Sequence, residues 1–313
     1  MPVIDVHTHG VGGYETKGAG PDDIIRIAEI HGSYGIDAVI PTIYSSSIKR
    51  MRADIAAVKK AMEMQGSGVG DRGWGRKKSS KPQTKKMKPA TILGVHLEGP
   101  FLNPVRAGAL DAHSFLPARI SHYKELIQGF GDIVKIITVA PELKGATGLI
   151  KTITDTSVIV SMGHSDATYG EAEAGFNAGA KGITHIFNAM RPVHHREPGI
   201  AGFGLTNPHI YVEVIADPFH LHPKTIELIF GAKKPDRIII VSDSVKAAKK
   251  DACTLGVADR AGRLLGGSTP VTESARYLVG LGFPKKIVER CVSVNPERYL
   301  AESGLRGIRT ICS

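Results

Sequence analysis

The sequence predicts an α/β fold, namely a (β/α)8 barrel of the TIM type with parallel strands. Its 313 residues are many for one compact domain but suit an α/β barrel. Eight short runs rich in β-branched residues alternate with amphipathic stretches, which is the pattern of repeated strand–helix units. Polar residues follow several of these runs, and such barrels form their active sites at the carboxyl ends of the strands. We therefore expect residues 1–313 to form a single barrel domain.

The predicted elements alternate along the chain. The strands are Val3–Val6, Asp37–Thr42, Ile92–Leu97, Val134–Val139, Val158–Met162, Gly182–Ile186, Tyr211–Ile215 and Arg237–Val241. The helices between them are Pro21–Tyr34, Ile48–Met64, Ala118–Gly129, Thr168–Ala178 and Pro223–Phe230. Two further helices, Val271–Leu281 and Pro284–Val292, follow the last strand. The pattern contains no internal repeat and no second domain.

The composition is that of a globular protein without a membrane segment. Hydrophobic residues make up 42%, and the 36 glycines and 18 prolines are spread along the chain. No apolar run approaches the roughly 18 residues that span a bilayer, and the start has no signal-peptide core. The 3 cysteines form no CxxC pair, so we expect reduced thiols and a cytoplasmic protein.

The formal charge of +10 is concentrated in one segment. Residues 66–90 are rich in lysine, arginine, glycine and serine, with Trp74 as their one residue able to stack on a base. We interpret this segment as a basic, flexible surface insertion, with a lid or tether as the alternative. No nucleic-acid-binding motif accompanies it, so we do not expect a nucleic-acid partner.

The polar residues at the strand ends predict a metal site. His7 and His9 follow the first run, Glu98 the third, His164 the fifth, His185 the sixth and Asp243 the eighth. In a His-x-His pair both side chains lie on the same face of the strand and can bind one cation. Imidazole and carboxylate ligands suit Zn, Fe, Mn or Co better than Mg or Ca. Inward-pointing His96 is expected to support the ligands rather than to be one.

Such a cation would lower the pKa of a bound water and polarise a carbonyl, as amide hydrolysis requires. Asp243 would then pass a proton from the attacking water to the leaving amine. A purely structural carboxylate, or a metal ligand without a proton role, is the alternative for Asp243. Farther along residues 161–202, Asn188 and Arg196 are suited to holding an anion.

Five motifs carry a family resemblance. They are GVHLEGPFLN around Glu98, MGHSDAT around His164, THIFNAM around His185, HHREPGIAG around Arg196 and VSDS around Asp243. Together they resemble the N-acetylglucosamine-6-phosphate deacetylases of the amidohydrolase superfamily, over about Ile4 to Leu300. The resemblance implies a (β/α)8 barrel that removes acetate from an N-acetylated amino-sugar 6-phosphate.

The resemblance also implies roles for residues. Glu98, His164 and His185 match the family's shared metal ligands, and Asp243 matches its catalytic acid/base. His7 and His9 match a pair found in members that hold a second metal, so one or two divalent ions, Zn or Fe first, are expected. The matching substrate-binding residues are Asn188, Ala189, Arg196, His220, Leu265 and Gly266. In this family some phosphate contacts come from a neighbouring subunit, which implies a homodimer.

The sequence departs from the family pattern in two further places. The family's small β-sandwich domain has no counterpart here, so we expect a barrel without it. After Glu98, Leu110 stands where the family has a histidine that contacts the substrate amide. A leucine cannot donate a hydrogen bond to an oxyanion. Either the metal polarises the carbonyl alone, or His113 substitutes, or the substrate differs.

Three functions follow from these residues. The first is metal-dependent hydrolysis of the acetamide of N-acetylglucosamine 6-phosphate. The second keeps this chemistry on a related substrate such as N-acetylgalactosamine 6-phosphate or another acylated amine. The third, suggested by Leu110 and the expected lack of the sandwich, is a catalytically weakened sugar-phosphate-binding protein.

Overall fold

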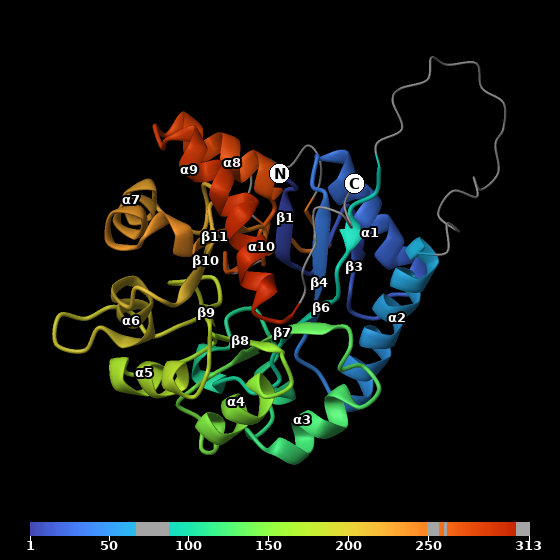
Figure 1. Cartoon of the computed structure of the whole chain (residues 1–313), viewed down its shortest axis with the longest axis horizontal. Helices are drawn as coiled ribbons and strands as arrows, with labels where there is room; N and C mark the ends of the chain where they lie inside the picture. Colours follow the sequence, from blue (N-terminus) through green and yellow to red (C-terminus); the bar gives the residue numbers. More distant parts are fainter. Residues whose placement is uncertain (67–87, 249–256, 260–261, 305–313) are drawn as a thin grey trace.

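The computed structural model describes residues 1–66, 88–248, 257–259 and 262–304. Their main sheet is parallel and barrel-shaped, as predicted (Figure 1). Its strands, in sheet order, are β1 (Ile4–Thr8), β4 (Ala38–Tyr44), β6 (Val95–Glu98), β7 (Val134–Val139), β8 (Ile159–Met162), β9 (Gly182–Ile183), β10 (Tyr211–Ile215) and β11 (Ile238–Val241). The basic insertion lies almost wholly outside the described residues, as do Cys253 and Cys312.

The barrel closes between its first and last strands. The N–H of Asp243 donates to the carbonyl of His7 at 2.9 Å, and Thr8 forms a parallel bridge with Ser244. This closure brings the ends of β1 and β11 together, so that His7 and Asp243 become neighbours although they are far apart in the sequence.

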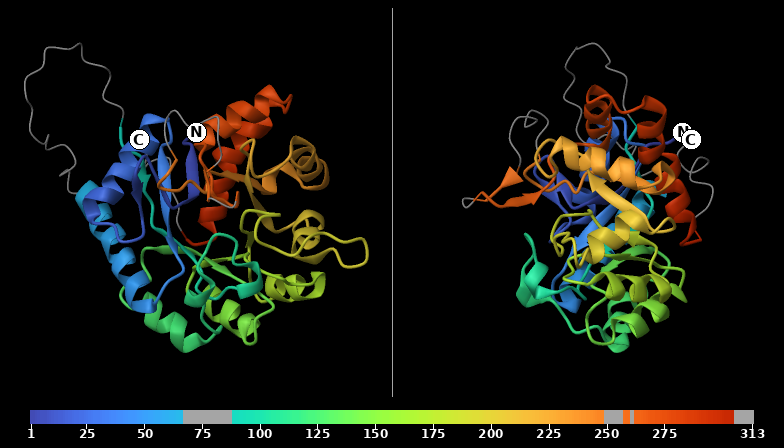
Figure 2. Two further views of the ribbon diagram at one scale, coloured as in Figure 1. Left: turned by 180° about the vertical axis from the view of Figure 1, so that it is seen from behind. Right: turned by 90° about the vertical axis from the view of Figure 1, so that its left-hand side faces the viewer.

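Helices cover the outside of the barrel (Figures 1 and 2). They are α1 (Pro21–Ser33), α2 (Ile48–Gly66), α3 (Ile120–Ile127), α4 (Ala146–Thr154), α5 (Tyr169–Asn177), α6 (Gly199–Thr206), α7 (Pro223–Ala232), α8 (Val271–Gly280), α9 (Lys285–Val292) and α10 (Val294–Ala301). The pattern did not predict α4, α6 or α10. Helix α6, GIAGFGLT, contains three glycines and almost all of it is buried, so packing overrides its weak helix propensity.

The interior of the barrel is apolar at one end and polar at the other. Apolar strand residues such as Ile4, Ile40 and Ile239 pack with Tyr299 and Leu300 of α10. In the right-hand view of Figure 2, α10 lies on the side opposite the projecting hairpin of β12 (Val257–Ala258) and β13 (Leu264–Gly266). Helix α10 therefore covers the amino end, and the carboxyl end with its polar side chains remains accessible.

One predicted strand is interrupted and another ends early. The third is divided into β5 (Thr91–Ile92) and β6 by Gly94, whose φ of 149° suits glycine. A Cβ on Gly94 would lie 2.4 Å from the carbonyl oxygen of Ile133, so close packing also requires glycine here. The sixth strand ends at Ile183 because the backbone turns into the left-handed region at His185.

The described residues include three further short helices and one more hairpin. The 3-10 helices are Pro104–Arg106, Ala112–Ser114 and Pro235–Arg237, and the hairpin pairs β2 (Gly10–Val11) with β3 (Tyr14–Glu15). None of the helices in this part of the chain is long and apolar enough to cross a membrane.

Candidate active site

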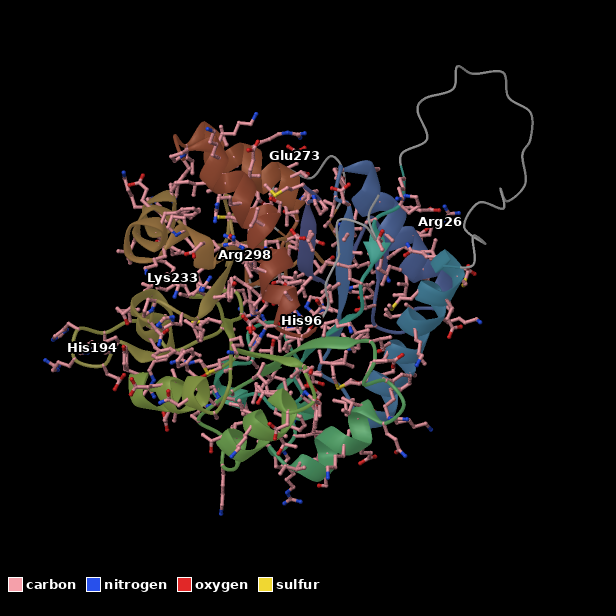
Figure 3. All side chains as sticks on the ribbon, in the orientation of Figure 1. Arg26, His96, His194, Lys233, Glu273 and Arg298 are labelled. Atoms are coloured by element: carbon pink, nitrogen blue, oxygen red, sulfur yellow. The ribbon has the colours of Figure 1, made fainter. Side chains whose placement is uncertain are left out.

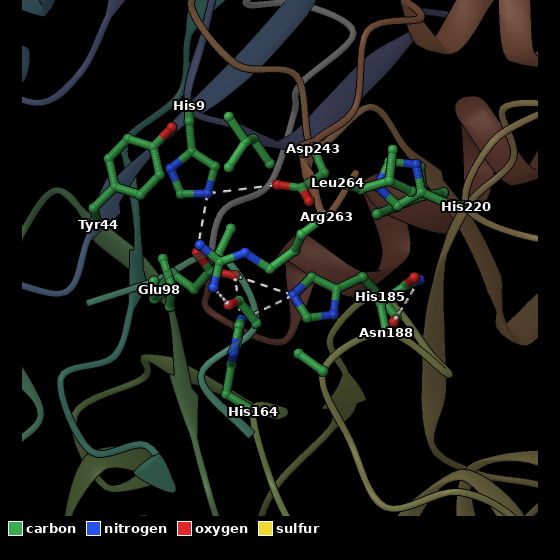
Figure 4. A pocket seen from close by; sticks show the side chains of 17 residues that line it. His9, Tyr44, Glu98, His164, His185, Asn188, His220, Asp243, Arg263 and Leu264 are labelled. Atoms are coloured by element: carbon green, nitrogen blue, oxygen red, sulfur yellow. Dashed lines mark hydrogen bonds and ion pairs between the residues drawn. The ribbon is translucent and has the colours of Figure 1, made fainter. Parts of the chain in front are cut away.

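A pocket of about 270 Å³ opens at the carboxyl end of the barrel (Figure 4). It is lined by most of the residues that the sequence assigned to the site: His9, Glu98, His164, His185, Asn188, Ala189, His220, Asp243, Leu265 and Gly266. His7 lies behind this lining and is fully buried. Arg196 is exposed on a loop and does not line the pocket. Figure 3 shows its neighbour His194 at the periphery of the molecule, far from His96 near its middle.

Glu98 at the end of β6 is the centre of the site. Its Oε1 lies 3.0 Å from Nε2 of both His164 and His185, and its Oε2 lies 3.0 Å from Nε2 of His9. Burial alone would raise the pKa of Glu98, but the facing imidazoles of His164 and His9 lower it well below its usual range. The carboxylate is therefore held ionised among several imidazole nitrogens.

The hydrogen bonds on the far side of the rings define which nitrogens can bind a cation. Nδ1 of His164 donates to the carbonyl of Arg106 at 2.9 Å, and Nδ1 of His9 donates to the carbonyl of Thr42 at 3.1 Å. A carbonyl only accepts, so in the neutral rings Nε2 carries the lone pair. Because these nitrogens lie 3.0 Å from the Glu98 oxygens, a proton or a metal ion must lie between each pair of atoms. The Glu98, His164 and His185 group therefore fits a divalent metal.

A second group adjoins the first. Nε2 of His7 lies 3.3 Å from Oδ1 of Asp243 and 3.6 Å from Oε1 of Glu98, and Nε2 of His9 lies 3.5 Å from the same Asp243 oxygen. Burial, and next the charge of Glu98, raise the pKa of Asp243 well above its usual range. His7, His9 and Asp243 form another group with the spacing of metal ligands.

The site residues have unusual backbone geometry. His164, His185, Ala189 and Asp243 have φ values of 47°, 30°, 49° and 47°, which non-glycine residues seldom adopt. Such strain collects at functional sites, where surrounding contacts maintain it. At Asp243 one such contact is the N–H of Gly267, which donates to its carbonyl at 2.7 Å. This bond places the β13 residues Leu265 and Gly266 at the pocket.

His220 is oriented by Asp217. Its Nδ1 lies 2.9 Å from Oδ2 of Asp217, whose Oδ1 also accepts from the backbone N–H of His220 at 2.8 Å. Burial would lower the pKa of His220, but the hydrogen bond and charge of Asp217 raise it above its usual value. The ring can therefore donate a hydrogen bond to a ligand in the pocket.

Known proteins that are similar to this chain are deacetylases of amino-sugar phosphates. The chain is 30% identical over 317 residues to N-acetylgalactosamine-6-phosphate deacetylase of Escherichia coli O157:H7, covering 97% of this chain and 78% of that protein. It is 32% identical over 248 residues to N-acetylglucosamine-6-phosphate deacetylase of Vibrio furnissii, covering 79% and 57%. The chain belongs to the N-acetylglucosamine-6-phosphate deacetylase family of the amidohydrolase superfamily.

Other comparisons extend this result. The enzyme of this family from Bacillus subtilis (strain 168) is 42% identical over 158 residues, which are 50% of this chain and 40% of that protein. The crystal structure of the deacetylase from Thermotoga maritima matches with a TM-score of 0.81 and 26% identity, covering 96% of this chain and 78% of the other. No protein-family model matches the chain.

Beside the candidate ligands, this deacetylase-family chain has a buried carboxylate that was not predicted from the sequence. Glu213 on β10 is buried, and its Oε2 accepts from Nδ1 of His7 at 3.1 Å. The Nε2 lone pair of His7 is thereby directed toward Asp243 and Glu98. A glutamate inside the apolar strand YVEVI was the available signal, because charged residues are rarely buried without a partner.

His96 is fully buried and hydrogen-bonded through both ring nitrogens. Its Nδ1 lies 3.2 Å from the carbonyl of Val6 and its Nε2 lies 2.9 Å from Oγ1 of Thr138. Both nitrogens therefore have partners. Although His96 lies near His7 and Glu213 in a third group with ligand spacing, it would have to give up a hydrogen bond to bind a metal.

The pocket lining also includes residues that were not predicted as part of the site, among them Tyr44 and Arg263. Tyr44 is the register partner of Glu98 and stacks on His9, with ring centroids 3.8 Å apart. Arg263 is the residue before β13, and its side chain lines the pocket (Figure 4). Leu110 also lines the pocket, whereas the alternative residue His113 is exposed and does not line it.

Proposed function

We propose that the chain hydrolyses the acetamide of N-acetylglucosamine 6-phosphate to glucosamine 6-phosphate and acetate. The observation that carries this proposal is the grouping of Glu98, His164, His185 and Asp243 in one pocket of a barrel of this family. The names of the Vibrio furnissii and Bacillus subtilis relatives support the same substrate.

In the proposed mechanism each residue has a separate role. Glu98, His164 and His185 would hold a divalent metal, Zn or Fe first, which when bound lowers the pKa of water and polarises a carbonyl. Asp243 accepts the proton of the attacking water and delivers it to the nitrogen of the leaving amine. Asn188, Ala189 and His220 contact the sugar phosphate, and Leu265 and Gly266 bound it at the rim.

We further propose that His7 and His9 form a second metal site together with Asp243. In this proposal Glu213 holds His7 in the orientation that ligation requires. Elemental analysis of protein purified without added metal tests the stoichiometry: two ions per chain support the second site, and one ion counts against it.

Glu213→Leu should weaken metal binding at His7 by about 10- to 100-fold, as is typical when a partner of a ligating histidine is lost. Metal content after dialysis against a chelator measures this, with Glu213→Gln expected to retain most of the affinity. The matched control is Thr138→Val, which removes the hydrogen bond between Thr138 and the buried side chain of His96. Equal metal loss in the leucine and control variants would show that Glu213 has only a structural role.

A second candidate substrate is N-acetylgalactosamine 6-phosphate, because the Escherichia coli relative that matches 97% of this chain carries that name. We expect the chain to release acetate from both epimeric substrates, with the higher kcat/KM for N-acetylglucosamine 6-phosphate. Acetate assayed under identical metal loading decides between them. A higher kcat/KM for the galactosamine epimer would reverse the assignment.

A catalytically weakened sugar-phosphate-binding protein is the third candidate. Leu110 lines the pocket where the family pattern has a histidine, and a lost oxyanion donor costs about 10²- to 10³-fold in rate. Binding of either sugar phosphate without acetate release from metal-loaded protein would favour this function over the first.

The proposal includes a homodimer and a cytoplasmic location. A partner subunit would account for the position of Arg196, which is exposed outside the pocket of its own chain. Light scattering during size-exclusion chromatography tests the dimer, and a monomer at assay concentrations would leave Arg196 without a route to the substrate.

A further inference from the structure

The anionic end of a sugar phosphate needs a cation that the metal ligands do not provide. Among the residues that line the pocket, Glu98 and Asp243 are acidic, and Arg263 is the one lysine or arginine of the described chain in this lining. Arg196 lies outside it, with Nη1 3.1 Å from Nε2 of His195. Among the described residues that line the pocket, the permanent positive charge therefore comes from Arg263.

Two contacts hold the Arg263 side chain at the rim. Its Nη1 donates to the carbonyl of Gly108 at 3.1 Å, and its Nε donates to Oδ2 of Asp259 at 3.1 Å. The bond to Gly108 joins the β12–β13 hairpin to the loop that follows β6, and the bond to Asp259 lies within the hairpin. They use two of the five N–H groups of a guanidinium, and the side chain is 60% exposed. The remaining N–H groups are suited to a fork-like contact with a tetrahedral anion.

Gly108, which accepts the bond from Arg263, adjoins both a metal-ligand candidate and the Asn188–Ala189 segment. A Cβ on Gly108 would lie 3.1 Å from Cβ of Ala189 and 3.6 Å from Cε1 of His164. Gly108 thus adjoins the Asn188–Ala189 segment proposed to hold the sugar phosphate. Figure 4 shows Tyr44 on one side of the metal-ligand group and Asn188 and His220 on the other. In that view the Arg263 side chain crosses in front of the metal-ligand group, and its bond to Gly108 joins it to the loop beside Ala189.

From these contacts we infer that Arg263 binds the phosphate of the substrate from within the same chain. The inference rests on the proposed function and names the specificity-determining cation of that site. Asp259 offsets part of the charge and keeps the guanidinium over the rim. Bidentate contact of the phosphate with the free N–H groups leaves the bond to Gly108 intact, so the loop after β6 and the hairpin stay joined while substrate is bound.

Steady-state kinetics of Arg263→Ala tests this role. We expect KM for N-acetylglucosamine 6-phosphate to rise about 10- to 100-fold, the range for loss of hydrogen bonds to a charged group, with kcat within a few fold of wild type. KM for unphosphorylated N-acetylglucosamine should change less than threefold. Arg263→Lys should fall between, because lysine keeps the charge and loses the fork. Arg276→Ala on α8, where the exposed arginine pairs with Glu273, is the matched control.

Three results would overturn the inference. Equal losses on phosphorylated and unphosphorylated substrates would mean that Arg263 only shapes the rim. Unchanged KM in Arg263→Ala together with a raised KM in Arg196→Ala would assign the phosphate to the partner subunit. Inorganic phosphate gives an independent measurement: calorimetric titration should show weaker binding to Arg263→Ala than to the Arg276→Ala control, and equal binding contradicts the inference. If wild type releases no acetate, the proposed function fails while this titration still decides the role of Arg263.

Discussion

Replacing Asp243 by asparagine is expected to lower kcat by about 10²- to 10⁴-fold, the contribution typical of a general acid–base residue. The asparagine side chain has nearly the same shape, so the backbone of the β11 end and the bond from Gly267 should persist. It cannot accept a proton from water or donate one to the leaving amine at neutral pH. Catalysis should therefore fail although the pocket remains formed.

Metal content must be measured in the same protein, because Asp243 has an alternative role. Its Oδ1 lies 3.3 Å from Nε2 of His7 and 3.5 Å from Nε2 of His9, so it also has the position of a ligand. We expect the ion at Glu98, His164 and His185 to be retained. Retained turnover would contradict the proton role, and loss of all metal with activity would favour a role as ligand only.

The gathering of polar side chains at the strand ends was predictable because position along a strand determines where a side chain lies. His7, His164 and Asp243 each come where an apolar run ends, and parallel strands of a barrel bring these ends to one rim. Sequence periodicity contains no equivalent rule for loops. Arg196 and Arg263 both occur in glycine-containing loops, and only the folded chain shows that Arg263 reaches the pocket.

Other parts of the fold depended on tertiary contacts that no local pattern records. Helix α6 is rich in glycine, and its burial compensates for weak propensity. The sixth strand was predicted to continue to Ile186, but the left-handed backbone of His185 ends it earlier. That conformation presents His185 to Glu98, so the error in the strand boundary falls at a residue of the candidate site.

Glu98→Gln is expected to remove metal from the protein and to reduce kcat/KM by more than about 100-fold, beyond the usual cost of losing a hydrogen-bond partner of a ligand. Glutamine keeps the volume of the side chain but loses the negative charge that faces His164, His185 and His9. A divalent ion would then be held by neutral imidazoles without the central carboxylate, which weakens both adjoining groups at once. Elemental analysis beside the acetate assay measures the two effects together.

The control for this change is Glu142→Gln, since Glu142 is a nearby carboxylate that accepts hydrogen bonds without facing a metal ligand. Its Oε2 accepts from Oγ of Ser165 at 2.7 Å, and its Oε1 accepts from Nδ2 of Asn103 at 2.9 Å. Glutamine at this position should cost stability, visible as a lower Tm, while the metal content stays at the wild-type value. If Glu98→Gln also retained its metal, the site could not be organised around the Glu98 carboxylate, and the ligand assignment would have to move to His7, His9 and Asp243.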